Sequence, residues 1–429
     1  MCFMKNQIID TIKVLYKKGF LHIFSSGLIN KIMGFVGNVI VVRNLTKSQY
    51  GAFGYADSIM AFAIIFCGFG ISSGILQFCS EKRPEKEKNA FTIFGLKYGV
   101  LASILVSLTC ILYAKLGNFE IEESKNILLF YAFYPVTFFF FDFFIIFFRT
   151  KKDNKRYALI RNINSVTYVF LAATLTYILD EYGILIGLYV STIVSSSIGF
   201  YYMRTEDVHK CDYKLNKTNK ISIIKFSTLS FTARIMSDML IFLDIFLIGT
   251  MIGNPEVLAL YKIATVIPLA LMIVPDSIIM FVYPYVAENK DNFQWLKDNF
   301  KKLFKISFII NGTITIILIL SAPLIIYTLW GAKYMEAITA FRLLSLNYFF
   351  SATFRFNLIN LLTAMYKIKK VFAVNLISSI VNILLDIIFI ENFGAIGAAY
   401  ATIIVVILSS LLLAYVMIKD INKIRFEQS

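Results

Sequence analysis

The sequence predicts an all-α membrane protein with about 12 transmembrane helices in two pseudo-symmetric six-helix lobes, and with both termini in the cytoplasm. Composition is the first reason. The 429 residues are 58% hydrophobic and 16% charged, with a mean hydropathy of +0.72, and a soluble domain of this length does not need so much apolar surface. The length of the apolar runs and the placement of Lys and Arg are the second and third reasons.

Each apolar run is long enough to form a transmembrane helix, since about 20 residues at ~1.5 Å per residue cross the hydrocarbon core. The predicted spans lie near residues 20–42, 52–79, 90–114, 127–148, 157–179, 183–203, 221–252, 257–285, 303–329, 335–364, 371–391 and 395–418. The break between 179 and 183 is short. We nevertheless expect the chain to reverse there, because an unbroken helix over 157–203 would be about twice as long as the bilayer is thick.

The positive charges predict the orientation of these spans. With the N-terminus inside, the cytoplasmic segments hold 28 Lys and Arg residues and the outer segments hold five. Cytoplasmic loops are enriched in Lys and Arg, and a miscounted span would mix the two sets. The net charge of +15 therefore reflects topology and contact with membrane lipid, and we expect no nucleic-acid partner.

The longest cytoplasmic connection divides the predicted spans into six and six. We expect an N-terminal lobe over residues 1–203, a linker over 204–220 and a C-terminal lobe over 221–429. Paired six-helix halves are a recurring transporter architecture, with the substrate site near the middle of the membrane. The first and seventh spans also share a short near match, with Lys31 before Ile-Met in one and Arg234 before Ile-Met in the other.

Lys31 and Arg234 lie deep within their spans, about 15–20 Å from the inner end. An Arg at the bilayer centre costs roughly 2.5–3.5 kcal/mol on insertion scales, so we expect both side chains to face a protein-lined or hydrated cavity. Small and polar residues share their helical faces: Gly27, Gly34 and Asn38 with Lys31, and Ser227, Ser230, Ser237 and Asp238 with Arg234. The alternative is a helix-packing seam combined with an ion pair of Arg234 and Asp238 within one helix.

The tenth and eleventh spans carry further polar residues, which are Arg342, Asn347, Ser351, Arg355 and Asn357, then Asn375, Ser378, Ser379, Asn382 and Asp386. Either they line a cavity or they form hydrogen bonds between helices. Acidic residues inside spans are Asp57, Asp142, Asp238, Asp244, Asp276 and Asp386. Asp57, Asp142, Asp238 and Asp386 are our candidates for carrying a coupling proton or sodium ion. The alternative is that they pair with nearby cations.

Enzyme and metal motifs give no competing prediction. We find no disulfide framework, no metal-ligand spacing, and no Walker, Rossmann or HExxH pattern. Residues 70–74 match GxSxG by letter. A hydrolase elbow, however, needs a preceding strand and a His partner, and His22 and His209 both fall at predicted cytoplasmic ends. We therefore expect no catalytic residues, no metal site and no cofactor other than a coupling ion, H⁺ or Na⁺.

Several segments resemble one known family. FSSGLINKIMGFVGNVIVVRNLTKSQYGAFGYADSI is similar to the opening of the Wzx-type O-antigen and polysaccharide flippases. In the C-terminal half, SAPLIIYTLWGAKYMEAITAFRLLSL, LLTAMYKIKK and VNILLDIIFIENFGAIGAAYATIIV look like that family's ninth to twelfth spans. These flippases form the polysaccharide transporter family of the multidrug/oligosaccharidyl-lipid/polysaccharide exporter superfamily. The resemblance implies two six-helix lobes around a V-shaped, cation-lined cavity that alternates its opening.

The resemblance also implies a substrate. It would be an undecaprenyl-diphosphate-linked oligosaccharide, a unit of O-antigen, capsule or another surface polysaccharide, turned across the bacterial cytoplasmic (inner) membrane during lipopolysaccharide or related biosynthesis. Lys31 and Arg234 fall where such flippases commonly hold a cation, and Lys262 and Arg355 are further candidates for holding the diphosphate. A polysaccharide polymerase would be a partner.

Two other functions would require different sequence features. A cation-coupled multidrug antiporter of the same superfamily would favour an acidic cavity, whereas Lys31 and Arg234 favour an anionic substrate. A membrane-embedded glycan polymerase or ligase would be expected to carry a large outer loop, and the longest predicted outer loop, 115–126, is too short.

Overall fold

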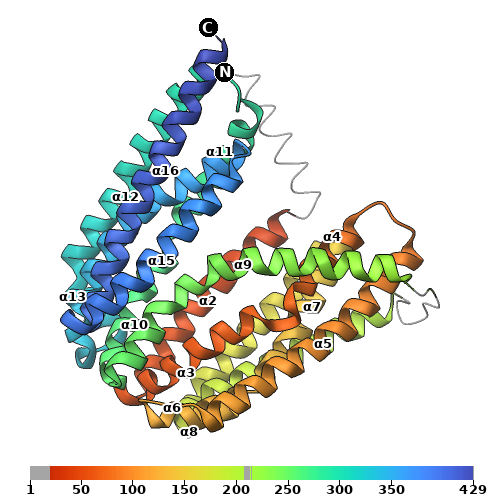
Figure 1. Ribbon diagram of the computed structural model, residues 1–429. Coiled ribbons are helices and arrows are strands. Elements are labelled where there is room, and N and C mark those ends of the chain that lie inside the picture. Colours follow the sequence, from red (N-terminus) through yellow and green to blue (C-terminus); the bar gives the residue numbers. More distant parts are fainter. Residues whose placement is uncertain (1–19, 207–212, 214, 429) are drawn as a thin grey trace. The chain divides into compact units, whose positions relative to one another are not determined.

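The computed structural model describes residues 20–206, 213 and 215–428, with side chains from Ser26 onward except 233–241, 423–425 and 427–428 (Figure 1). Every regular element in these described residues is a helix. The chain forms two compact units. The N-terminal unit is the chain up to Gln49 with Ala56–Asp238, and the C-terminal unit is Tyr50–Tyr55 with Met239–Ser429.

The boundary between the units does not fall in the predicted linker at 204–220. It falls within two helices. The first part of α9 (Lys217–Ile252) groups with the N-terminal unit. There, a Cβ added to Gly70 would lie 2.5 Å from the carbonyl oxygen of Ser227, and one added to Gly74 would lie 2.3 Å from its hydroxyl. This close approach holds the start of α9 against α4. The predicted six-and-six division stays a prediction.

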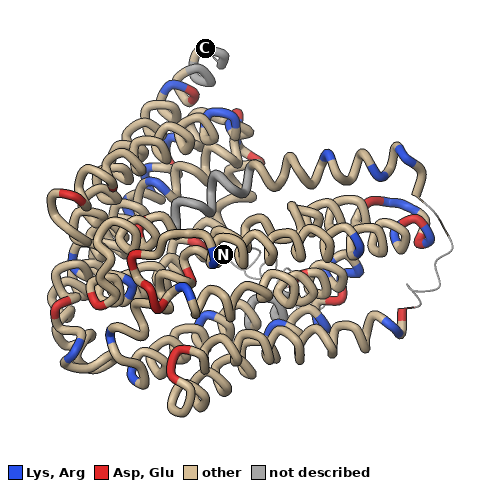
Figure 2. The backbone as a smooth tube through the Cα atoms, turned by 60° about the horizontal axis from the view of Figure 1, so that its bottom comes forward, with Lys and Arg blue, Asp and Glu red and all other residues tan. Residues whose placement is uncertain are grey.

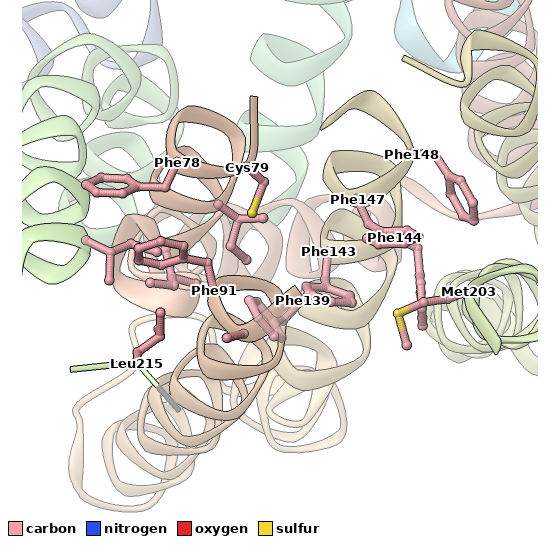
Figure 3. Close-up of a cluster of buried hydrophobic side chains, with 14 of the residues drawn as sticks. Phe78, Cys79, Phe91, Phe139, Phe143, Phe144, Phe147, Phe148, Met203 and Leu215 are labelled. Carbon is pink, nitrogen blue, oxygen red and sulfur yellow. The ribbon is translucent and has the colours of Figure 1, made fainter. Parts of the chain in front are cut away.

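The N-terminal unit is built from α2 (Phe20–Asn44), most of α3 (Lys47–Ile65), the 3₁₀ helix η1 (Cys67–Gly70), α4 (Ile71–Ser80), α5 (Glu85–Leu116), α6 (Glu122–Tyr131), α7 (Tyr134–Thr150) and α8 (Asn154–Arg204). Its core is aromatic. Phe139, Phe143 and Phe147 follow one another along α7 and pack with Phe91 of α5 (Figure 3). Close packing of these rings stabilises the unit.

The predicted reversal near residue 180 is confirmed. Asp180 has φ 50° and ψ −138°, which interrupts the helical backbone of α8. Asn164 donates to Ser195 at 3.3 Å, and a Cβ added to Gly183 would lie 2.4 Å from the backbone of Leu175. The two segments of α8 therefore run antiparallel and touch, and only a residue without a side chain fits at Gly183.

The C-terminal unit contains α10 (Pro255–Ala270), α11 (Ile273–Glu288), α12 (Phe293–Trp330), the 3₁₀ helix η3 (Ala332–Ala337), α13 (Ile338–Phe350), the π-helix η4 (Ser351–Arg355), α14 (Phe356–Ala364), α15 (Ile368–Phe393) and α16 (Ala395–Gln428). Its core is aliphatic, with Leu296, Leu361 and Leu413 among its most buried members. Gly394, at φ 61°, makes the tight turn between α15 and α16.

Each of the twelve predicted runs is mostly helical where the structure describes it, with short breaks such as those at 132–133 and 271–272. By length and composition, seven helices in the described residues can cross a membrane, or up to eight if α6 and α7, bent by 46°, form one span. Large apolar side chains remain exposed along these helices, such as Leu101 at 70% and Leu320 at 74%, as expected for surfaces that face lipid. The chain is a multi-pass membrane protein. Its count of 12 spans and the side of its termini stay predictions.

Candidate functional site

The first two predicted cations belong to the N-terminal unit. Lys31 is exposed on α2. Arg234 and Asp238 lie on α9, and their side chains fall outside the described residues. The predicted cavity and the alternative ion pair within the helix therefore both remain predictions.

Lys262 lies in the C-terminal unit and is held by aromatic rings. Its ammonium nitrogen is 4.8 Å from the centroid of Phe53 and 5.5 Å from that of Tyr50. Both rings belong to the short α3 segment that packs into this unit, where a Cβ added to Gly54 would lie 3.0 Å from the Lys262 side chain. Cation–π contacts of this kind contribute about 0.5–2 kcal/mol. They hold the ammonium group beside the two rings.

Arg355 is the last residue of the π-helix. Its side chain is half-buried, and its Nε is buried without a hydrogen-bond partner. π-Helices are uncommon and occur often at functional sites, and a buried guanidinium donor without an acceptor is costly. Arg342, by contrast, is exposed, and its Nε donates to the carbonyl oxygen of Ile319 at 3.2 Å.

Three neighbouring polar residues of the tenth predicted span, Asn357, Tyr348 and Thr353, form hydrogen bonds between helices. The Asn357 amide donates to the Ser307 hydroxyl at 3.0 Å, and the Tyr348 hydroxyl donates to Asn311 at 2.9 Å. Asn311 in turn donates to Thr353 at 3.3 Å. For Asn357 the structure supports the alternative of hydrogen bonding inside the bundle. The buried Oδ1 of Asn347 has no hydrogen-bond partner, and Arg355 does not take part in the network.

Of the four candidate acids, the two with described side chains in the N-terminal unit have partners. Asp142 of α7 accepts a hydrogen bond from the Ser72 hydroxyl at 2.5 Å. Asp57 interacts electrostatically with the buried Tyr131 and Tyr134. The Ser72 hydroxyl of the GxSxG letter match donates to this carboxylate, so the serine joins α4 to α7.

Asp386 differs from both. It is 0% exposed, and neither of its carboxylate oxygens has a hydrogen-bond partner. Among the side chains that the structure describes, no Lys or Arg nitrogen lies within 4.0 Å of it. Asn382, one turn earlier on α15, is 5% exposed, and its buried Nδ2 is also unpaired. The alternative that Asp386 pairs with a cation is therefore wrong for the described residues.

A second carboxylate lies close to Asp386. Asp244 of α9 accepts hydrogen bonds from the Tyr261 hydroxyl at 2.7 Å and from the Thr402 hydroxyl at 2.9 Å, and it interacts electrostatically with Asp386. Helices α9, α10, α15 and α16 thus bring two acids together inside one unit. Two carboxylates in a low-dielectric site favour binding of a proton or of a cation with oxygen ligands.

Asp244 is one of the acidic residues inside the predicted spans, but it was not among our candidates for carrying a coupling ion. Tyr261 and Thr402 were not predicted from the sequence. Asp386 and Asn382 share a helical face at a four-residue interval, which is visible in the sequence. Nothing in the sequence shows that α9 and α16 bring Asp244 and Thr402 to that face.

Relatives identify the family. Residues 16–290 match the family of polysaccharide biosynthesis proteins. A Shigella flexneri protein whose name assigns it to O-antigen transport is 26% identical over 253 residues, which are 58% of this chain and 57% of the relative. The match thus spans little more than half the length of that curated relative.

Solved structures show the fold. An inward-facing multidrug resistance MATE family transporter of the MOP superfamily aligns with a TM-score of 0.75 at 14% identity, over 93% of this chain and 96% of the other. The lipid II flippase MurJ, in an inward closed conformation, aligns with a TM-score of 0.74 at 19% identity, over 94% and 89%. Because the family match covers more than half of the sequence, the chain belongs to the polysaccharide biosynthesis protein family, and its resemblance to the Wzx-type flippases is confirmed.

Proposed function

We propose that this protein is a flippase that moves undecaprenyl-diphosphate-linked oligosaccharide units, of O-antigen, capsule or another surface polysaccharide, across the bacterial cytoplasmic membrane by alternating access. Family membership over residues 16–290 carries the proposal. The names of the O-antigen transporter relative and of the lipid II flippase with the same fold support it. A polysaccharide polymerase would take up the translocated unit.

The physical problem for such a flippase is the diphosphate. Its charges cannot enter hydrocarbon bare, but Lys and Arg side chains in a low-dielectric site can replace lost hydration with charge-assisted hydrogen bonds. Lys31, Arg234, Lys262 and Arg355 are the proposed contacts. Lys262, held over Phe53 and Tyr50, and Arg355, whose Nε has no acceptor, support this role best. The prenyl tail can stay in lipid while the head group crosses.

We assign the coupling ion to the acid pair of the C-terminal unit. Asp386 has two unpaired oxygens, and Asp244 is oriented by Tyr261 and Thr402. Binding of H⁺ or Na⁺ would neutralise the pair, and release would restore repulsion between the two carboxylates. A change in ion occupancy then favours one arrangement of these helices over another, which is what alternating access requires.

A cation-coupled multidrug antiporter is the second candidate. The structural similarity to a MATE family transporter and the buried acid pair favour it. The two candidates differ in substrate charge. The cations Lys262 and Arg355 suit an anionic head group, whereas a cationic drug would be repelled by them.

A transport assay separates the two candidates. Purified protein in proteoliposomes is given a fluorescent undecaprenyl-diphosphate oligosaccharide, and the fraction accessible to an external glycosidase is followed with and without a sodium or pH gradient. We expect translocation that is lost in Lys262→Ala and kept in Lys333→Ala, which removes a cation outside the spans. Ethidium efflux without any glycan-lipid translocation would establish the antiporter instead.

A further inference from the structure

The N-terminal unit contains a pocket that the transport proposal does not use. It has a volume of about 210 Å³ and lies between the start of α5 and the turn that joins α7 to α8. Its lining residues are Cys79, Glu85, Lys88, Asn89, Thr92, Thr150, Lys151 and Lys152. Drug-sized ligands fill roughly 300–1,000 Å³, so this pocket is too small for an oligosaccharide and has the size of a lipid head group.

The charges that line the pocket are unbalanced, with three lysines and one glutamate. The Glu85 carboxylate forms ion pairs with the ammonium groups of Lys151 at 2.7 Å and of Lys88 at 3.2 Å. The Glu85 side chain is 63% exposed, whereas those of Lys88 and Lys151 are 21% and 27% exposed. The two ammonium groups are therefore held in the pocket wall, and the carboxylate that they share lies at its edge in water. A phosphate, which carries more acceptor oxygens, can displace such an exposed carboxylate from the two lysines.

Two further features of the pocket bear on what it can bind. Lys152 has a positive φ of 57°, which a residue with a side chain rarely adopts, and the turn places Lys151 and Lys152 side by side in the chain at the pocket. Asn89 also lines the pocket, and its Oδ1 is buried without a hydrogen-bond donor. The pocket therefore offers ammonium groups to a phosphate and one buried acceptor to a hydroxyl.

The position of the pocket indicates where the ligand comes from. It lies where the apolar helices α4, α5 and α7 end or begin, on connections that the distribution of Lys and Arg assigns to the cytoplasmic side. Figure 2 shows that many of the Lys, Arg, Asp and Glu residues lie at helix ends and turns. Basic pockets between transmembrane helices on that side bind anionic lipid head groups.

We propose that this pocket binds the phosphate of an anionic lipid of the inner leaflet, and that the lipid has a hydroxylated head group such as phosphatidylglycerol. Lys88, Lys151 and Lys152 contact the phosphate, Asn89 accepts a hydrogen bond from a head-group hydroxyl, and Glu85 is displaced from the lysines. Lipid bound there joins α5 to the α7–α8 turn and stabilises the N-terminal unit. This inference is independent of the transported substrate.

The test measures lipid binding to the full chain by native mass spectrometry. Dioleoyl phosphatidylglycerol, dioleoyl phosphatidic acid, dioleoyl phosphatidylcholine and soluble glycerol 3-phosphate are titrated separately. We expect the first phosphatidylglycerol to bind about ten-fold more tightly than phosphatidylcholine, and the double variant Lys151→Gln/Lys152→Gln to lose most of this preference. The matched control, Lys82→Gln/Lys155→Gln, removes two lysines from the same side but not from the pocket, and should keep the preference.

Two single variants keep the proposal testable if the double variant does not fold. Glu85→Gln frees both ammonium groups and should tighten phosphatidylglycerol binding several-fold. Asn89→Leu should reduce the affinity for phosphatidylglycerol to that for phosphatidic acid. Equal binding of phosphatidylglycerol by wild type and the Lys151/Lys152 variant would overturn the proposal. Equally tight binding of glycerol 3-phosphate would show a site for soluble phosphate and would also overturn it.

Discussion

Asp142 of the N-terminal unit differs in its partners from Asp386 and Arg355 of the C-terminal unit. In the N-terminal unit, hydrogen bonds join the polar residues of α2 to those of α8: Ser26 donates to Asn162 at 2.7 Å, and Ser165 donates to Asn30. Asp142 is held by Ser72 in the same unit. In the C-terminal unit, Asp386 has no hydrogen-bond partner, and neither does the Nε of Arg355. Because a buried ionisable group without a partner is costly, the difference indicates that Asp142 contributes to stability whereas Asp386 and Arg355 are available for ligands.

Among the substitutions that test this difference, Asp386→Asn should have the largest effect on transport. Removing the buried charge should abolish ion-coupled transport, a loss of at least about ten-fold, while the protein becomes no less stable, since replacing an uncompensated buried charge is often neutral or stabilising. Transport is followed in the proteoliposome assay, and the free energy of unfolding in detergent. Unchanged coupling in this variant would remove Asp386 from the ion site.

Ser72→Ala is the opposite case and should act on stability. It removes the hydroxyl that donates to Asp142, and because both side chains are half-buried the loss should cost about 1 kcal/mol. The variant should therefore unfold at lower denaturant, while the transport rate per folded molecule stays the same. A specific loss of transport without destabilisation would place Asp142 in the mechanism and weaken the contrast between the units.

Arg355→Met should reduce transport by about ten-fold or more without reducing stability, because it removes a donor that has no acceptor and keeps the length of the side chain. Arg355→Lys should restore part of the rate through its charge. If both variants transport normally while Lys262→Ala does not, only Lys262 binds the head group in this unit.

Phe53→Leu should have a smaller effect. Loss of a cation–π contact worth about 0.5–2 kcal/mol should raise the substrate concentration for half-maximal transport by a few-fold, because the Lys262 ammonium group is less well held. Phe53→Tyr keeps the ring and serves as the control. Equal effects of the two substitutions would indicate that packing, and not the ring face, positions Lys262.

The smallest effect concerns pH and a surface group of the N-terminal unit. Hydrogen bonds from Gln77, and then from Arg83, hold the pKa of Glu81 below its usual range. A lowered pKa in the folded state stabilises the protein at pH values above the ordinary carboxylate range, and this stabilisation is lost as the pH falls through the folded pKa. Glu81→Gln should therefore lower the melting temperature slightly at pH 7 and not at pH 3. Because Glu81 is partly exposed, the shift should be close to the limit of measurement.

The sequence allowed much of the fold to be predicted. The apolar runs located the helices, and the short polar break located the reversal at Asp180, because a helix of that length could not stay in the bilayer. It did not predict that Tyr50–Tyr55 would pack into the C-terminal unit, since the adjoining residues of one continuous helix carry no mark of the unit that they join.

The candidate acids show where prediction from the sequence ends. Asp142 and Asp386 each stand alone in an apolar run, and from this pattern we can conclude only that each needs a partner or a function. Tertiary packing decided between these outcomes, because it placed Ser72 beside Asp142 and a second acid, Asp244, beside Asp386. The free energy of a buried charge depends on its neighbours from other helices, and which helices become neighbours is settled only when the chain folds.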